Sequence, residues 1–257
     1  MSDDVLAAAR DGVLRVTLNR PEKRNPLSRA ALAQLREVFA AHRDTELSLV
    51  VLRGTGDQSF AAGGDLRDLE QVRTPEQARA LHDLGGGALQ AIRDFPAPVV
   101  AALNGVALGG GAELAVACDL RIAAAHARIG FVQGTLNIPA AWGGGHDLIA
   151  LLGPARGLEL LGAARVLSAT QALAAGLVEA VAPEGEEFAA FVERWIAPFA
   201  RQRPQVMRAF KAQAAAAKRG APRAQSQARD AELFARAWCH ADHWAAAESI
   251  LRKEASR

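Results

Sequence analysis

The residues best suited to chemistry lie in one glycine-rich stretch, Asn104–Asp119, which reads NGVALGGGAELAVACD. A strand-like apolar run precedes three consecutive glycines, Gly109–Gly111, and a helical run follows them. Consecutive glycines allow a sharp turn and a close approach to a ligand, and the first turn of a helix carries backbone N–H groups without partners. Such groups can stabilise a developing oxyanion, and Glu113 adds a carboxylate beside them. The other interpretation is a tight turn in which Glu113 only complements the helix dipole.

A second glycine-rich turn, Gly63–Asp65, follows the apolar run Leu47–Arg53 in the same strand-then-glycine order. If the two turns meet, their N–H groups can donate to one oxygen, which is the oxyanion hole of acyl-transfer chemistry. Neither turn has the GxxxxGK[ST] pattern of a phosphate loop, and no GxGxxG lies between a strand and a helix. Binding of an NAD-type dinucleotide is therefore disfavoured.

The elements that position these turns alternate between strands and helices as far as residue 182. Apolar runs predict strands at Val13–Asn19, Leu47–Arg53, Pro98–Leu103, Leu120–Ala123 and Leu177–Val181. Capping residues predict helices that begin after Ser28, Thr74 and Ser168. From Phe188 onward the chain is alanine-rich and helical, with breaks at Pro204, Gly220–Pro222 and near Cys239. This pattern predicts an α/β core over residues 1–187 and a helical region over residues 188–257.

Composition and charge narrow the classes of function. The formal net charge is +2 and there are two cysteines, so neither a nucleic-acid partner nor a disulfide framework is required. No apolar run is long enough to cross a membrane. The opening residues, MSDDVLAAARDG, lack the basic and apolar regions of a secretory signal. We therefore expect a cytoplasmic protein without a membrane partner.

One basic segment leaves its role open. Arg201–Arg229 carries eight basic residues and no acidic one. It is either a patch for nucleic acid or another anion, or a solvated helix face. Its one aromatic residue, Phe210, argues against single-strand binding, which relies on several stacking side chains.

Five passages together resemble the crotonase family, the enoyl-CoA hydratase/isomerase superfamily. They are LNRPEKRNPLS (Leu18–Ser28), SFAAGGDL (Ser59–Leu66), NGVALGGGAELAVACDLRIA (Asn104–Ala123), WGGG with LLG (Trp142–Gly153) and LSATQALAAGLVEAV (Leu167–Val181). The resemblance implies a spiral of ββα turns and C-terminal helices that build homo-oligomers, either trimers or dimers of trimers. It also implies an acyl-CoA thioester as substrate, with no metal and no separate cofactor.

The resemblance also implies roles for individual residues. The two backbone donors to the thioester oxygen fall on Gly64 and Gly110, and Glu113 matches one of the two catalytic glutamates of the hydratases. The segments that wrap the CoA moiety match Lys23, Arg24, Ala62, Gly64, Asp65 and Leu66. Polarising the thioester carbonyl stabilises an enolate, and each such donor contributes about 3–4 kcal/mol to lowering the barrier.

Gln133 departs from the hydratase pattern, because the second catalytic glutamate of that pattern falls on this position. A glutamine can hold a water molecule but cannot exchange a proton near neutral pH. Acid–base catalysis contributes about 10²–10⁴-fold, so the departure weakens both hydration and isomerisation. The passage FVQGTLNIPAAWGG is similar to the ethylmalonyl-CoA decarboxylase-like branch, which leaves decarboxylation open. A catalytically weak CoA-binding member and an RNA-binding member remain further alternatives.

The remaining candidate residues have weaker signals. His146 is a possible acid, whereas His240 and His243 fit a surface or an interface better than a metal site. Cys118 reads as a small core residue, and Asp119 is expected to pair with Arg121 or to cap. Trp142 reads either as a wall of the acyl pocket or as core.

Overall fold

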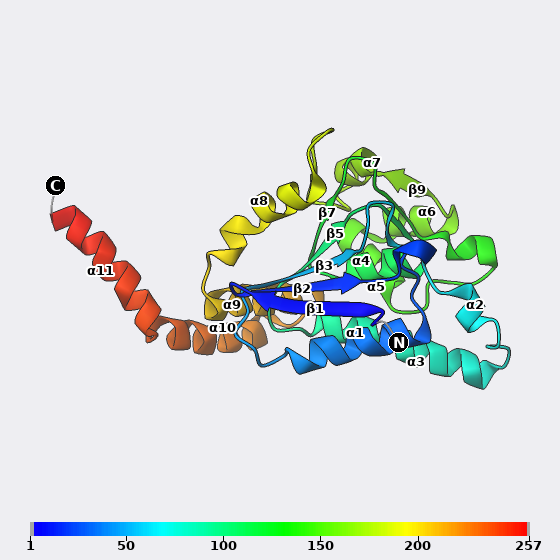
Figure 1. Cartoon of the computed structure of the whole chain (residues 1–257). Helices are drawn as coiled ribbons and strands as arrows, with labels where there is room; N and C mark the ends of the chain where they lie inside the picture. Colours follow the sequence, from blue (N-terminus) through cyan, green and yellow to red (C-terminus); the bar gives the residue numbers. More distant parts are fainter. Residues whose placement is uncertain (1–2, 256–257) are drawn as a thin grey trace.

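Two β-sheets form the centre of the structure, a computed structural model that describes residues 3–255 (Figure 1). The six-stranded sheet has the order β1-β2-β3-β5-β7-β10, and the four-stranded sheet has the order β4-β6-β8-β9. Only the β1–β2 and β8–β9 pairs are antiparallel among the described strands. The strands are β1 Val5–Arg10, β2 Val13–Leu18, β3 Leu49–Gly54, β4 Ser59–Ala61, β5 Val99–Leu103, β6 Val106–Leu108, β7 Leu120–Ala123, β8 Arg128–Gly130, β9 Val166–Ser168 and β10 Ala180–Val181.

From β3 to β8, consecutive strands alternate between the two sheets, and a helical segment follows each pair. The strands β3, β5 and β7 lie in the large sheet, while β4, β6 and β8 lie in the small one. The helices that follow these pairs pack around the sheets, so the chain advances as a spiral of ββα turns (Figure 1). This arrangement confirms the predicted fold class.

The helices begin where the capping residues predict. The side chain of Ser28 accepts a hydrogen bond from the N–H of Ala31 at the start of α1, and Thr74 and Ser168 form full capping boxes at the starts of α3 and α7. The helical segments are η1 Pro21–Lys23, α1 Arg29–Ala41, α2 Leu66–Leu69, α3 Pro75–Arg93, α4 Gly110–Ala117, η2 Val132–Leu136, α5 Gly144–Leu152, α6 Pro154–Gly162, α7 Ala169–Ala174, α8 Phe188–Ala200, α9 Pro204–Lys218, α10 Arg223–Trp238 and α11 Ala241–Ala255.

One strand is shorter than its prediction. Residues 177–179 of the expected strand Leu177–Val181 lie outside β10, although the N–H of Glu179 donates to the carbonyl of Arg121 in β7 at 2.8 Å. The N–H groups of Leu177 and Val178 instead donate to the carbonyl of Ala172, which closes the C-terminus of α7. Gly176, at φ 75°, makes the left-handed turn there.

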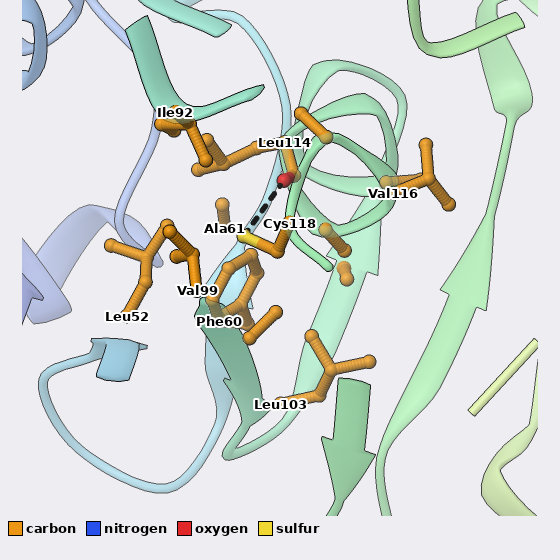
Figure 2. Close-up of a cluster of buried hydrophobic side chains, with 14 of the residues drawn as sticks. Leu52, Phe60, Ala61, Ile92, Val99, Leu103, Leu114, Val116 and Cys118 are labelled. Carbon is orange, nitrogen blue, oxygen red and sulfur yellow. Dashed lines mark hydrogen bonds between the residues drawn. The ribbon is translucent and has the colours of Figure 1, made fainter. Parts of the chain in front are cut away.

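The apolar core lies on both faces of the large sheet. On one face Leu52 of β3 and Phe60 of β4 pack with Leu114 of α4 (Figure 2). On the other face Val51 and its neighbours on β2, β5 and β7 pack against α8, including its Phe191. A sheet covered on both faces needs strands that are apolar throughout, which accounts for the continuous run in β3.

The helices after residue 187 have two different settings. The helices α8 and α9 lie against the core, whereas α10 and α11 extend away from it (Figure 1). Several apolar side chains of α10 and α11 are exposed, among them Phe234, Trp238, Trp244, Ile250 and Leu251. The division at residues 187 and 188, and an oligomeric role for this region, stay predictions. Over residues 3–255, no helix is both long and apolar enough to span a membrane.

Candidate active site

Glu113 is a buried carboxylate held by four donors. Its side chain is 2% exposed in the first turn of α4. Oε2 accepts the N–H of Trp142 at 2.8 Å and that of Gly144 at 3.0 Å. Oε1 accepts Nε2 of Gln133 at 2.8 Å and, at the longer distance of 3.4 Å, the N–H of Ala141. Since a carboxylate oxygen can accept two strong hydrogen bonds, Oε1 is the oxygen with capacity for a further donor.

The buried environment of Glu113 favours the protonated form of its carboxyl more than water does. Burial raises the pKa of the Glu113 carboxyl above its ordinary value, and the hydrogen bonds from Gly144, Trp142, Gln133 and Ala141 oppose that rise only in part. A carboxyl with a raised pKa is better matched to taking up and returning a proton near neutral pH. The geometry and the pKa therefore both suit general acid–base chemistry.

Gln133 lies directly beside this carboxylate. Its side chain is 8% exposed within η2, and Nε2 points at Glu113. The other amide atom, Oε1, is buried and has no hydrogen-bond partner among the described residues. A buried acceptor without a donor carries a free-energy cost, and a donor on a bound molecule would relieve it. The structure thus brings the predicted side chains of Glu113 and Gln133 together. It leaves Oε1 of Gln133 as a buried acceptor without a donor among the described residues.

The two glycine-rich turns meet, which fulfils the condition that the sequence left open. A Cβ added to Gly63 would lie 3.0 Å from the carbonyl oxygen of Leu108 and 3.7 Å from the nitrogen of Gly110. The strands that lead into the turns, β4 and β6, are parallel neighbours. Gly63 itself has φ +101°, a conformation that favours glycine.

Among residues 3–255, no acceptor pairs with the N–H group of Gly64 or of Gly110. Gly64 forms a parallel bridge with Leu27, in which Leu27 donates to the carbonyl of Gly63 and Asp65 donates to the carbonyl of Leu27. The N–H of Gly64 therefore points to the opposite side of its strand. Gly110 is the first residue of α4, where the helix offers no acceptor to its N–H. Their role as an oxyanion hole stays a prediction.

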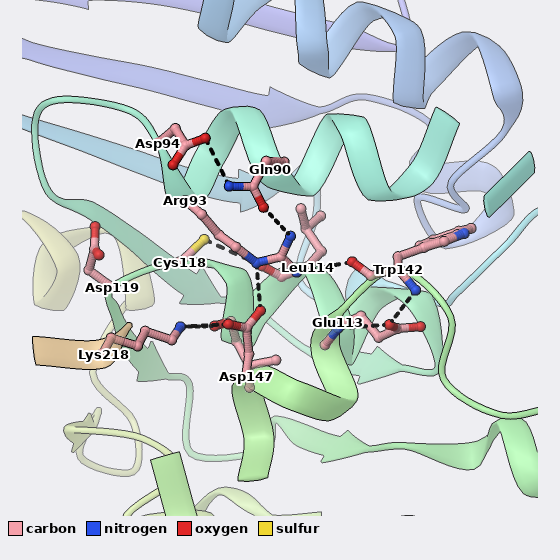
Figure 3. Close-up of polar contacts among 12 residues, drawn as sticks. Gln90, Arg93, Asp94, Glu113, Leu114, Cys118, Asp119, Trp142, Asp147 and Lys218 are labelled. Carbon is pink, nitrogen blue, oxygen red and sulfur yellow. Dashed lines mark hydrogen bonds and ion pairs between the residues drawn. The ribbon is translucent and has the colours of Figure 1, made fainter. Parts of the chain in front are cut away.

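A chain of polar contacts holds the peptide segment at Trp142 that binds Glu113 (Figure 3). The carbonyl of Trp142 accepts Nη2 of Arg93 at 3.0 Å. Arg93 Nε binds Asp147 Oδ2 at 2.7 Å, and Lys218 of α9 binds Asp147 Oδ1 at 2.7 Å. One peptide segment at Trp142 is thus fixed on both sides, by the carboxylate of Glu113 and by Arg93. These side chains position Glu113 without touching it.

No feature of the sequence pointed to this supporting chain. Arg93 closes a helix, and Asp147 reads as an acidic residue in the first turn of α5, so both have an ordinary explanation as complements to helix dipoles. The donors to Glu113 are backbone N–H groups of a loop, and side-chain identity does not encode where they point.

The residues expected to contact CoA lie at one edge of the site. Lys23 and Arg24 are exposed, and neither forms an ion pair within residues 3–255. The carbonyl of Arg24 accepts the N–H of Ala62 at 3.1 Å, which joins the two loops. Asp65 binds Arg20 at 2.9 Å, and Leu66 is 63% exposed. A hollow of about 420 Å³ opens beside Lys23 and Asp65. Their contact with CoA stays a prediction.

The other candidate residues lie apart from Glu113. His146 is exposed and lines a separate hollow beside α9. His240 contacts Asp242, and His243 packs on the ring of Trp238. In the described part of the chain, no group of three or more His, Cys, Asp or Glu side chains is arranged to hold a metal ion.

Three further predictions are resolved by contacts in the core. Cys118 is 1% exposed, and burial raises the pKa of its thiol to about 12, so it is a core residue. Of the two expectations for Asp119, the side-chain pair with Arg121 is wrong, because Asp119 binds Lys211 and Arg121 binds Glu179. The carboxylate of Asp119 does accept a backbone N–H, that of Val99 at the start of β5. Within the basic segment 201–229, Lys211 and Lys218 bind the carboxylates of Asp119 and Asp147.

Comparison with known protein families and sequences gives consistent matches. The family model described as enoyl-CoA hydratase/isomerase matches residues 8–253. The chain is 39% identical over 183 residues to enoyl-CoA hydratase domain-containing protein 2, mitochondrial, of Bos taurus, covering 71% of this chain and 62% of that protein. It is 39% identical over 165 residues to crotonyl-CoA hydratase of Syntrophomonas wolfei, covering 64% and 63%.

A decarboxylase and a solved hydratase structure are also similar. Ethylmalonyl-CoA decarboxylase of Bos taurus is 33% identical over 203 residues, covering 78% of this chain and 66% of that protein. In each of these three relatives the match spans less than two thirds of the relative's length. The crystal structure of an enoyl-CoA hydratase from Bacillus anthracis superposes with a TM-score of 0.90 at 28% identity, covering 97% of this chain and 96% of that one. These matches confirm the family resemblance of the motifs.

Proposed function

The chain belongs to the enoyl-CoA hydratase/isomerase family, and on that premise we propose that it is an acyl-CoA enzyme that stabilises a thioester enolate. The thioester oxygen binds between the N–H groups of Gly64 and Gly110, and Glu113 exchanges the proton. The reaction proposed first is the hydration of a 2-enoyl-CoA, the activity after which relatives such as crotonyl-CoA hydratase are named.

One observation carries this proposal: the carboxylate of Glu113 and the unpartnered Oε1 of Gln133 are adjacent, buried acceptors. A water molecule has two O–H donors, and in the proposed complex it donates one to Oε1 of Glu113 and the other to Oε1 of Gln133. Neither acceptor alone would orient both hydrogens. The raised pKa of Glu113 then suits removal of one of these protons.

The proposed hydration step balances with these groups alone. The water oxygen forms a bond to the β-carbon while Glu113 takes one of its protons. The electron pair of the double bond moves toward the thioester oxygen, where the two N–H groups stabilise the developing charge. Glu113 then returns the proton to the α-carbon. We propose this sequence without a metal or redox cofactor, and CoA enters only as part of the substrate.

A second candidate, decarboxylation of ethylmalonyl- or methylmalonyl-CoA, is favoured by a specific observation. The position of the second hydratase glutamate is a glutamine, and a relative is named ethylmalonyl-CoA decarboxylase. Cleavage of the bond to the carboxylate leaves its electron pair on the α-carbon, which gives the same enolate. That step releases carbon dioxide and needs the oxyanion hole but no base, so Gln133 would not impair it. The α-carbon of the enolate then takes up one proton, from a water molecule or from the protonated carboxyl of Glu113.

Product masses from two separate incubations test the proposal. Purified protein is mixed with crotonyl-CoA or with ethylmalonyl-CoA, and Glu113→Gln is the matched variant. A gain in mass of one water from crotonyl-CoA, abolished in the variant, supports hydration. Loss of one carbon dioxide from ethylmalonyl-CoA, without hydration of crotonyl-CoA, supports decarboxylation instead. If the wild-type protein changes neither thioester, the enzymatic proposal is wrong.

We also propose that the chain forms a homo-oligomer, a trimer or a dimer of trimers, in the cytoplasm. The exposed apolar side chains of α10 and α11 support association, since they would otherwise remain in water. The exposed free thiol of Cys239 suits a reducing compartment. Sedimentation that gives a monomer at micromolar concentration would contradict the assembly.

A further inference from the structure

The indole of Trp142 occupies a slot made by three glycines. A Cβ added to Gly85 of α3 would lie 2.4 Å from both Nε1 and Cε2 of this ring. A Cβ added to Gly110 would lie 2.4 Å from Cζ3, and one added to Gly64 would lie 3.9 Å from Cη2. Any side chain at Gly85 or Gly110 would collide with the ring. The slot therefore exists only because these positions lack a Cβ.

The benzene edge of the ring adjoins both predicted oxyanion donors. Cη2 is the atom close to Gly64 and also one of the atoms close to Gly110, while the pyrrole side rests on Gly85. A thioester carbonyl held by the N–H groups of Gly64 and Gly110 would thus lie near the indole. Trp142 is 8% exposed, so the surrounding residues cover most of the ring.

The backbone that carries the ring is held in place. The N–H of Trp142 donates to Glu113 Oε2 at 2.8 Å, and its carbonyl accepts Arg93 Nη2 at 3.0 Å. Figure 3 shows the indole extending from this fixed segment away from the Glu113 carboxylate. Displacing the backbone of Trp142 would remove a hydrogen bond from the buried carboxylate. Moving the ring aside by shifting this backbone would therefore disturb Glu113.

From this geometry we propose that Trp142 closes the acyl end of the site and limits the substrate to thioesters with short acyl groups. The inference rests on the proposed function and narrows it to one substrate class. Crotonyl and ethylmalonyl groups fit that class, and a decanoyl chain does not. Trp142 acts here as a specificity-determining residue, through the volume of its side chain alone.

Binding of saturated acyl-CoAs tests this inference without requiring turnover. Isothermal titration with CoA, butyryl-CoA and decanoyl-CoA gives the chain-length preference of the wild-type protein. We expect butyryl-CoA to bind more tightly than decanoyl-CoA by about tenfold or more, since pockets commonly discriminate single methylene groups to that degree. In Trp142→Ala, which keeps the N–H and carbonyl of residue 142, decanoyl-CoA should gain at least that factor.

Two further variants and the possible outcomes complete the test. Trp142→Leu opens the slot less than alanine does and should give an intermediate gain, whereas Trp142→Phe should retain the short-chain preference. Wild-type protein that binds decanoyl-CoA as tightly as butyryl-CoA would overturn the inference even if no variant folds. Folded alanine and leucine variants with the wild-type preference would overturn it as well. Absence of binding to CoA and to both thioesters would instead refute the proposed function itself.

Discussion

Adjacent glycines of α3 provide a matched pair of substitutions that tests the packing of Trp142. Gly85→Ala places a Cβ 2.4 Å from Nε1 and from Cε2 of Trp142, whereas the Cβ of Gly86→Ala meets no atom within 4 Å. Both positions lie inside the same helix, Pro75–Arg93. Replacing a helix-interior glycine with alanine stabilises a protein by about 1 kcal/mol when there is room for the methyl group.

The difference between the two variants isolates the collision. The gain in helix propensity is common to both and cancels, so what remains is the cost of overpacking at Gly85. Ordinary van der Waals contact begins near 3.4 Å, so the ring or the helix must shift by about 1 Å, and overpacking of this kind costs about 1–3 kcal/mol. We therefore expect Gly86→Ala to raise the free energy of unfolding by about 1 kcal/mol. Gly85→Ala should be less stable than Gly86→Ala by about 1–3 kcal/mol.

Urea unfolding followed by far-ultraviolet circular dichroism measures these differences. All variants are compared at one protein concentration, because association would add to the apparent stability. In the Trp142→Ala background the ring is gone, and Gly85→Ala should no longer carry a penalty relative to Gly86→Ala. The double-mutant cycle should give a coupling free energy equal to the overpacking cost. Equal stability of the two single variants, or a coupling near zero, would refute the account of the slot.

Three further predictions concern the polar groups of the site. Burial raises the pKa of Glu113, so the stability that this carboxyl contributes is full below about pH 4.5 and is lost as pH rises through the raised pKa. Urea unfolding at several pH values should therefore show Glu113→Gln gaining stability relative to wild type across that window. A stability difference that does not change with pH would contradict the pKa shift. Gln133→Glu should raise hydratase turnover by about tenfold or more, as measured with crotonyl-CoA, and an unchanged rate would contradict the reasoning that the missing second carboxylate limits hydration. Asp147→Asn should lower the free energy of unfolding by about 2–3 kcal/mol, which is less than the loss of a fully buried pair because Lys218 is 40% exposed. Turnover should fall as well. Turnover equal to that of the wild type would show that Asp147 does not help to position Glu113.

The helices and the large sheet were predictable because local signals determine them. Ser28, Thr74 and Ser168 bind the N–H groups of the helices they precede, and the continuous apolar run of β3 reflects a sheet covered on both faces. The four-stranded sheet was missed. Its strands β4, β6, β8 and β9 have three residues each, too few to show a period.

The site was predictable only in part, and the reason is physical. Glu113, Gln133 and the two glycine turns have distinctive residue types, and the structure brings them together. Three of the four donors to Glu113 are backbone N–H groups of the loop around Trp142, and residue type does not specify their direction. A glycine inside a helix, such as Gly85, ordinarily only lowers helix stability, but Gly85 is the position that admits the indole of Trp142.

The central claim is that the N–H groups of Gly64 and Gly110 polarise a bound thioester carbonyl. Gly110→Pro would remove one donor, but it would also place a Cβ 2.4 Å from the indole of Trp142, so loss of activity in that variant has two causes. The carbonyl stretching frequency of a bound ligand tests the claim directly. Isotope-edited infrared spectra of butyryl-CoA labelled with carbon-13 at the thioester carbonyl should show a shift to lower frequency on binding to the wild-type protein. A bound ligand whose carbonyl frequency equals that in water would contradict the oxyanion hole.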